Sequence, residues 1–272
     1  MFKTLSNLLL ACLLMYSCGK NDHAELEKLS RENILALHEA EQWSLKNSVF
    51  LNEEKNEASA KDIERFANGL VSADYYANKE GIIKKTVFRP TTYQDKITYI
   101  LIKNIDYHPA DGIPYIDVNC DSLYVLIESC YRNQEALPGI STVVTDTMSV
   151  FDHSRVILAS IEKDCGLPSL EQHGKKVVKD YWDIIHHNEK EVIAYYYSYI
   201  EKLVQDGHIH PEKLALSADR LLMNYGYKQV YGSQIVNSKL YPIENPDSVN
   251  IRRAAIELEP LADYLEVYGL EW

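Results

Sequence analysis

The side chains with the greatest capacity for chemistry are concentrated between residues 181 and 253. His187 can serve as a general base or a ligand, because imidazole titrates near neutral pH. Asp219 can orient such a base, and Arg220 can stabilise developing negative charge. These residue types are compatible with one alternative, an enzyme, for example a hydrolase, that uses His187 with Asp219 and Arg220. Two structural roles stay open: a histidine that stabilises a helix C-terminus, and a structural ion pair of the Asp219-Arg220 charges.

A second candidate is the segment 226–241, which is dense in hydrogen-bonding groups. Amides and hydroxyls of this kind can bind a neutral ligand or satisfy buried backbone groups. Four of its residues are the predicted binding residues: Gln229, Tyr231, Gly232 and Gln234. The alternative is a β-hairpin that turns near Asn237-Ser238, with its glutamines holding the loop on the helices.

A metal site is not expected. His186 and His187 are adjacent, so on a helix they point about 100° apart and cannot form an i, i+4 ligand pair. The string formed by Asp206, His208 and His210 lies on a short loop and matches no fixed ligand spacing. We predict no metal and no cofactor.

The first 17 residues read as an export signal. A basic Lys3 precedes the apolar run 8–15, and the small residue Ser17 comes directly before Cys18. The apolar run is far shorter than the roughly 20 residues of a spanning helix. We therefore predict a lipoprotein whose lipidated Cys18 anchors it in the bacterial cell envelope, with the outer membrane as the expected location. The alternative is a plain signal peptide that is cleaved elsewhere.

Composition limits the function classes. The chain has 272 residues, 46% of them apolar, and a formal charge of -12. This is typical of a folded globular protein, and the acidity argues against a nucleic-acid partner. After the signal and Cys18, three cysteines follow: Cys120, Cys130 and Cys165. Three thiols allow at most one disulfide within the chain.

The candidate residues must be positioned by helices. Apolar spacing, caps and breakers predict helices over 22–54, 60–79, 123–136, 145–164, 177–187, 189–206 and 211–225, with short helices from Pro246 and Pro260. The segment 82–118, with runs such as 97–102, has a β-branched texture and predicts a small β or irregular insert. The expected fold class is mainly α. The expected organisation is a signal peptide (1–17), an N-terminal helical region with a small β insert (18–118) and a multi-helical domain (119–272).

Several short pieces of the C-terminal region occur in one order with close spacing. They are Gly166-Leu167-Pro168, Gly174, Trp182 with His187, Asp219-Arg220, Gln229-Val230-Tyr231-Gly232-Ser233-Gln234, Pro242-Ile243 and Arg252-Arg253. Together they resemble the bacterial domain-of-unknown-function family 6624, over about residues 119–272. The chain differs from the family pattern at three positions, where that pattern has Trp, Gln and Thr: Leu167, His186 and Ser233.

The resemblance implies a mostly helical domain and brings no established activity. Position by position, it marks His187, Asp219, Arg220, Gln229, Tyr231, Gly232 and Gln234, which can line one cleft or form a polar network that defines the fold. Because the sequence contains no complete set of nucleophile, base and orienting group, we favour a binding or interaction protein of the cell envelope. Its envelope ligand or protein partner is not specified by the sequence. The alternative is the envelope hydrolase described above.

Overall fold

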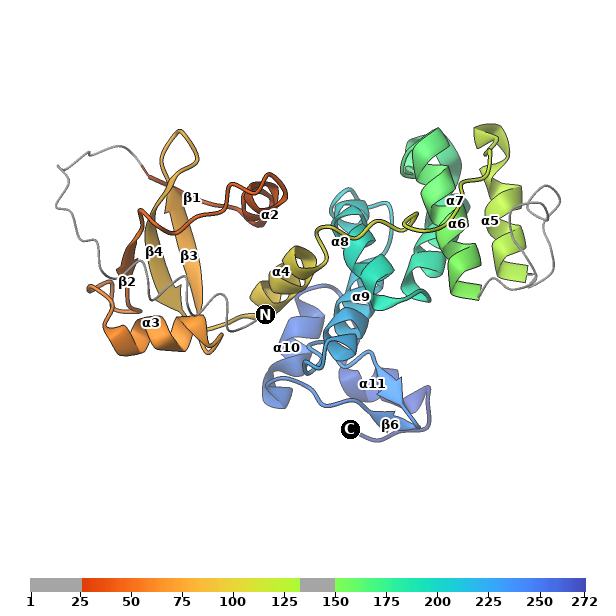
Figure 1. Ribbon diagram of the computed structural model, residues 1–272. Helices are drawn as coiled ribbons and strands as arrows, with labels where there is room; N and C mark the ends of the chain where they lie inside the picture. The colour runs from red at the N-terminus through yellow and green to blue at the C-terminus, as the bar shows by residue number, and fades with distance from the viewer. Residues whose placement is uncertain (1–25, 133–149) are drawn as a thin grey trace. The chain divides into compact units, whose positions relative to one another are not determined.

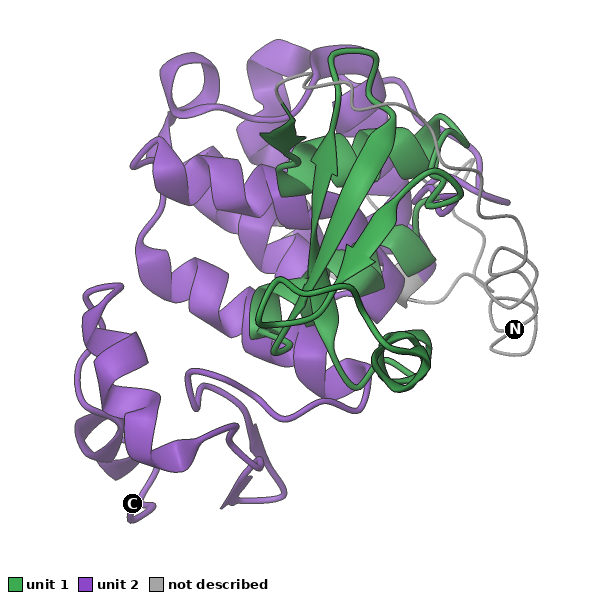
Figure 2. Cartoon of the chain, turned by 90° about the vertical axis from the view of Figure 1, so that its left-hand side faces the viewer, with its two compact units in different colours: residues 1–105 green, residues 106–272 purple. Residues whose placement is uncertain are grey.

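The computed structural model describes residues 26–132 and 150–272. The chain divides into two compact units, residues 1–105 and 106–272 (Figure 2). The predicted signal segment 1–17 and Cys18 lie outside the described residues. Within the described ranges, no helix combines the length and the apolar character needed to cross a membrane.

Unit 1 is an α/β structure built on a four-stranded sheet (Figure 1). Its elements are β1 (Glu27–Lys28), α2 (Arg31–Glu39), β2 (Val49–Leu51), α3 (Ala60–Ala67), β3 (Ser72–Ala77), β4 (Ile83–Arg89) and α4 (Tyr93–Lys103). The strand order is β1-β3-β4-β2. Strand β3 is antiparallel to both β1 and β4, whereas β2 runs parallel to β4. On one face, Phe66 of α3 stacks on Phe88 of β4, with ring centroids 5.0 Å apart.

The expectation of a mainly α chain is wrong, because unit 1 mixes helices with a sheet. The helix expected over 60–79 ends at Ala67, since Gly69 adopts φ +70°. The residues after it form β3, which is hydrogen-bonded to a strand on each side. Pairing on both edges outweighs the helical spacing of Ile63, Phe66 and Leu70 that suggested a longer helix.

Two further expectations in unit 1 are wrong. The segment 22–54 contains one helix of nine residues, α2, flanked by strands β1 and β2. Conversely, the β-branched run 97–102 belongs to helix α4. Thr92 and Asp95 form a capping box that starts this helix, and Ile97, Ile100 and Leu101 are buried at helical spacing. A strong N-cap with an i, i+3, i+4 apolar face favours the helix over the local β preference.

Unit 2 is predominantly helical (Figure 1). Its elements are α5 (Leu123–Arg132), α6 (Val150–Cys165), α7 (Leu170–His186), α8 (Lys190–Gln205), α9 (Pro211–Asn224), β5 (Ile235–Val236), β6 (Lys239–Leu240), α10 (Val249–Ala254) and α11 (Leu261–Glu266). The helices predicted over 189–206 and 211–225 are confirmed as α8 and α9. The predicted end of the helix over 123–136 and the predicted start of the helix over 145–164 lie outside the described residues.

One apolar cluster holds the helices of unit 2 together. It includes Tyr181, Trp182 and Ile185 of α7 with Ile157 of α6 and Ile200 of α8, all at most 2% exposed. Burying one such side chain contributes about 1.5–3 kcal/mol relative to its exposure. This cluster fixes the C-terminal end of α7, where the candidate histidines lie.

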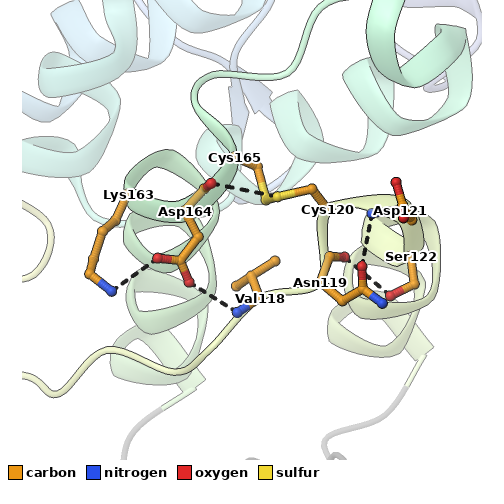
Figure 3. The surroundings of a disulfide bond; sticks show 8 residues. All are labelled: Val118, Asn119, Cys120, Asp121, Ser122, Lys163, Asp164 and Cys165. Atoms are coloured by element: carbon orange, nitrogen blue, oxygen red, sulfur yellow. Dashed lines mark hydrogen bonds and ion pairs between the residues drawn. A yellow bond between two sulfur atoms is a disulfide. The ribbon is translucent and has the colours of Figure 1, made fainter.

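A disulfide joins Cys120 to Cys165 (Figure 3). Cys130 is a free thiol. The bond connects a short turn before α5 to the last residue of α6. Next to it, the Asp164 carboxylate accepts a hydrogen bond from the Val118 amide at 3.0 Å. The three thiols therefore form one bridge, as their number permits, and leave one thiol over.

Candidate functional site

The end of α7 places the two candidate histidines differently. His186 is the last residue of α7 and is 4% exposed, whereas His187 is the C-cap and is exposed. The prediction that both lie in the last turn is confirmed. The His186 ring stacks on Trp182, with centroids 4.8 Å apart, and Trp182 donates from Nε1 to the Ser217 hydroxyl of α9 at 3.1 Å. The inward histidine is therefore His186, whereas the candidate general base, His187, faces outward.

His186 is neutral at physiological pH. Burial lowers its pKa from 6.5 to about 2, and the positive charge of Arg220 acts in the same direction. Its Nδ1 is buried and has no hydrogen-bond partner in the described part of the chain. Desolvation and Arg220 also lower the pKa of His187. Neither ring carries a positive charge near pH 7.

Asp219 of α9 is fully buried, and its carboxylate is occupied by a loop. It accepts hydrogen bonds from the amides of Val230 at 2.6 Å, Tyr231 at 3.0 Å and Ser233 at 3.0 Å. The Ser233 hydroxyl adds a fourth donor at 2.9 Å. Burial raises the pKa of Asp219, while these hydrogen bonds act to lower it. Asp219 has no hydrogen bond to His187, so it does not orient that ring as the hydrolase hypothesis requires.

The carbonyl groups of the same loop are held by two arginines. Arg252 donates from Nε to the Val230 oxygen at 2.9 Å, and Arg253 donates from Nη1 to the Tyr231 oxygen at 2.7 Å. Arg253 is only 2% exposed. Asp219 and the two arginines thus satisfy the backbone donors and acceptors of two consecutive residues, Val230 and Tyr231, as buried backbone requires.

Gln229 connects this loop to the following hairpin. Its side chain donates to the carbonyl groups of Gln234 at 3.1 Å and Tyr241 at 2.6 Å, and its Oε1 accepts from the Gln234 amide at 2.8 Å. Strands β5 and β6 pair in an antiparallel hairpin, and Asn237 and Ser238 both have positive φ at its turn. The hairpin alternative of the sequence analysis is confirmed, and Gln229 has a structural role.

Gly232 is required by close packing. It adopts φ +76°, a region that L side chains rarely occupy. A Cβ at this position would lie 2.7 Å from Cδ1 of Leu261 and 3.0 Å from Cδ1 of Ile243. Gly232 therefore lets the loop pass close to α11.

Arg220, next to Asp219 on α9, faces a different part of unit 2. Its Nη1 donates to the His186 carbonyl oxygen at 2.6 Å and lies 3.4 Å from His187 Nδ1. Its Nε lies 3.5 Å from Oε1 of Gln234. No carboxylate pairs with Arg220 within residues 26–132 and 150–272, and burial lowers the pKa of its guanidinium. The Asp219-Arg220 pair is thus not an ion pair, because the two side chains serve different partners.

A pocket of about 200 Å³ opens beside Arg220. Of the predicted site residues, Arg220 and Gln234 line it. His187, Asp219, Gln229, Tyr231 and Gly232 do not. Sequence reasoning missed His186, Tyr264 and Tyr268 as lining residues. One sequence signal could have identified the two tyrosines. Tyr264 lies in α11 and Tyr268 follows it four residues later, and this i, i+4 spacing places both side chains on the same face of a helix.

The string 206–210 has structural roles. Asp206 pairs with Lys202 at 2.8 Å, and His208 lies 3.0 Å from a Glu171 oxygen. His210 caps α9 by accepting from a backbone amide through its side chain. In the described ranges, no group of three or more His, Cys, Asp or Glu side chains is arranged to hold a metal ion.

The pocket-bearing part of unit 2 defines a helical domain completed by a small hairpin. The model of a family of unknown function, DUF6624, matches residues 132–271, which is more than half of the chain. The chain belongs to this family. Comparison with curated proteins finds no match, and comparison with solved structures finds none either.

Proposed function

We propose that this protein is a lipoprotein of the bacterial cell envelope that binds a small ligand in the pocket beside Arg220. The observation that carries the proposal is the pocket itself, lined by a cation without an acidic partner and by the polar groups of Gln234, Ser233 and Tyr264. A concave site with apolar walls and a few convergent polar groups is typical of ligand binding. The anchor rests on the sequence around Cys18.

The distribution of hydrogen bonds favours binding over hydrolysis. The Asp219 carboxylate is occupied by three amides and one hydroxyl, so it is not available to orient His187. The Ser233 hydroxyl donates to that same carboxylate and has no histidine partner. A hydrolase that acts through an activated serine or cysteine needs a nucleophile, a base and an orienting group in mutual contact. The described residues around the pocket do not form that set.

The anchor is tested by mass spectrometry of the full chain expressed in a bacterial host. We expect the mature protein to begin at Cys18, to carry acyl chains and to sediment with membranes. The Cys18→Ser variant, as the matched control, should lose the acyl mass and the membrane association. An unmodified Cys18, or a mature chain that begins elsewhere, would contradict the anchor.

Ligand binding is tested by thermal unfolding of the full chain with a panel of small acidic, neutral and basic compounds. At least one class should raise the unfolding temperature, because a ligand that binds only the folded state stabilises it. Ile235→Trp should abolish the shift by filling the pocket. Val236→Trp on the same strand is the control, since successive strand residues point to opposite faces. The proposal fails if no class shifts the native chain, or if both variants respond equally.

A further inference from the structure

We propose that the ligand of this pocket is a small monocarboxylate, held by Nε and Nη2 of the Arg220 guanidinium. The inference rests on the proposed function, because it names the chemical class that the same pocket takes. Four observations support it: the unpaired Nη2 donor of Arg220, the charge of the lining, the neutral His186 ring in that lining and the volume.

The hydrogen bonds of Arg220 use Nη1 and Nε of its guanidinium and leave Nη2 without a partner in the described ranges. Both contacts with the end of α7, to the His186 oxygen and to His187 Nδ1, use Nη1. The Nε contact with Gln234 is long, at 3.5 Å. Among the described residues no acceptor bonds to Nη2. The Nε and Nη2 edge of a guanidinium matches the two oxygens of a carboxylate in a bidentate pair.

The charge of the pocket matches a single negative charge. Arg220 is its one permanent cation, and no Asp or Glu side chain lines it. His186 adds no charge near pH 7, because burial lowers its pKa to about 2. A carboxylate balances one guanidinium, whereas a phosphate monoester carries up to two negative charges at this pH and would leave one uncompensated. The lining therefore favours a carboxylate over a phosphate.

His186 supplies the independent observation. It lines the pocket at 4% exposure, and its Nδ1 is buried without a hydrogen-bond partner in the described chain. Unsatisfied buried polar atoms are uncommon in native proteins, and each requires an explanation. The Nδ1 atom is enclosed by protein, so what the pocket receives from this residue is a polar ring without charge. The ring therefore adds polarity to the lining without requiring a second negative charge on the ligand.

The volume restricts the rest of the ligand. About 200 Å³ is below the range of roughly 300–1,000 Å³ that is typical of drug-sized ligands. Leu216 and Ile235 provide apolar walls, and Tyr264 and Tyr268 provide aromatic ones. A carboxylate with a short apolar tail, such as butyrate, fits this combination.

The test compares matched ligands on the purified full chain by isothermal titration calorimetry. The probes are butyrate, its neutral counterpart butyramide, inorganic phosphate, and N-acetyl-Ala-Ala with a free or an amidated end. Butyrate should bind saturably, and butyramide should bind at least about 10-fold more weakly, because it loses a charged bidentate contact. Tight binding of the free-ended peptide alone would identify a peptide terminus, and not a free acid, as the source of the carboxylate.

Two variants and one control separate binding from folding. Arg220→Gln should abolish butyrate binding, although it also removes a contact with the α7 carbonyl. Gln234→Glu keeps Arg220 and places a carboxylate beside it, so it should exclude the anion while circular dichroism stays native. The control, Lys228→Gln, removes one exposed positive charge from the same unit and should leave binding unchanged.

The outcomes distinguish the inference from the proposed function. Equal binding of butyrate and butyramide, or equal losses in Lys228→Gln and Gln234→Glu, would overturn the carboxylate assignment. Binding of phosphate without any carboxylate would also overturn it, while leaving the pocket as a ligand site. If none of these probes binds and no compound of the wider panel stabilises the chain, both proposals fail.

Discussion

Replacing His186 with glutamine should make unit 2 less sensitive to acid. His186 is buried and neutral in the folded chain, where its pKa is about 2, against 6.5 for an ordinary histidine. A lowered folded pKa means that the unfolded chain binds a proton first as the pH falls. The stability that the neutral ring contributes is therefore complete above pH 6.5 and is lost progressively below it. Glutamine does not titrate and should not show this loss.

The magnitude follows from proton linkage. Well below pH 6.5, each further unit of acidification lowers the unfolding free energy of the native chain by about 1.4 kcal/mol, until the pH approaches the folded pKa of His186. When the pH falls from 7.5 to 5.5, the unfolding free energy of the native chain should decrease by about 1.4 kcal/mol more than that of His186→Gln. When the pH falls from 7.5 to 4.5, this extra decrease should be about 2.7 kcal/mol. Both pH values lie far above 2, so the expected difference depends almost entirely on the unfolded pKa. Other titrating groups occur in both proteins and cancel.

The assay is urea unfolding at the three pH values and constant ionic strength. Trp182, stacked on His186, reports on unit 2 when Trp43 and Trp272 are replaced with phenylalanine. The neighbouring His187→Gln is the matched control. Its ring is exposed, so its pH effect should be much smaller. A stability gap between the native chain and His186→Gln that stays constant from pH 7.5 to 4.5 would refute the neutral, buried state of this ring.

Three further changes have defined expectations. Asp219→Asn replaces a carboxylate oxygen with an amide nitrogen, which cannot accept hydrogen bonds from the loop donors. It should lower the unfolding free energy at pH 7 by about 3 kcal/mol or more, as measured by urea titration. An unchanged midpoint would contradict the carboxylate's role. Gly232→Ala should lower the unfolding free energy by about 2–4 kcal/mol, because this position has a positive φ and a close contact with Leu261. Gly166→Ala should lower it by only about 1 kcal/mol, because that position has a positive φ but open space around it. Equal losses in the two variants would exclude the packing contribution. Reducing the Cys120–Cys165 bond, whose sequence separation is 45, should lower the unfolding free energy by about 4 kcal/mol, because the bond restricts the unfolded chain. Unfolding with and without reductant measures this loss. No difference would show that the bond does not constrain the unfolded chain.

The helices of unit 2 were predictable because their caps and apolar spacing agree. Pro211 opens α9, and Gly207, at φ +72°, follows the end of α8. Asn188 and Glu191 have the spacing of a capping box, but they do not form one, since Glu189 is the N-cap and makes no side-chain cap bond. Pro260 also precedes α11 as its N-cap instead of beginning it.

Unit 1 was predicted poorly because its strands depend on partners distant in sequence. Strand β2 has only three residues and is defined by parallel pairing with β4. Neither strand carries a local signal strong enough to specify that pairing. The helix α4 was missed for the opposite reason, because its cap at Thr92 was not weighed against the β-branched run that follows.

The candidate site was only partly predictable, because residue types do not reveal which way a side chain points. Arg220 and Gln234 were identified and do line the pocket. The sequence did not show which of His186 and His187 faces inward, because that direction depends on the stacking of His186 on Trp182. Tyr264 was missed because α11 lies far from the motif in sequence and reaches the pocket only through the tertiary fold.

In the Asp219-Arg220 pair, one residue holds the loop that forms a wall of the pocket, and the other lines the pocket itself. Adjacent residues on a helix point about 100° apart, so the two side chains must serve different neighbours. Asp219 faces inward and holds the amide and the hydroxyl of Ser233, which lines the pocket, while Arg220 reaches the end of α7 and the pocket. The Ser233 carbonyl accepts a hydrogen bond from the Tyr264 hydroxyl. A loop fixed from both its amide and its carbonyl side gives a rigid wall, which limits the ordering cost of binding. Loss of binding in an Asp219 variant must therefore be judged together with its stability, whereas the same loss in Gln234→Glu with a native fold reports on the ligand contact itself.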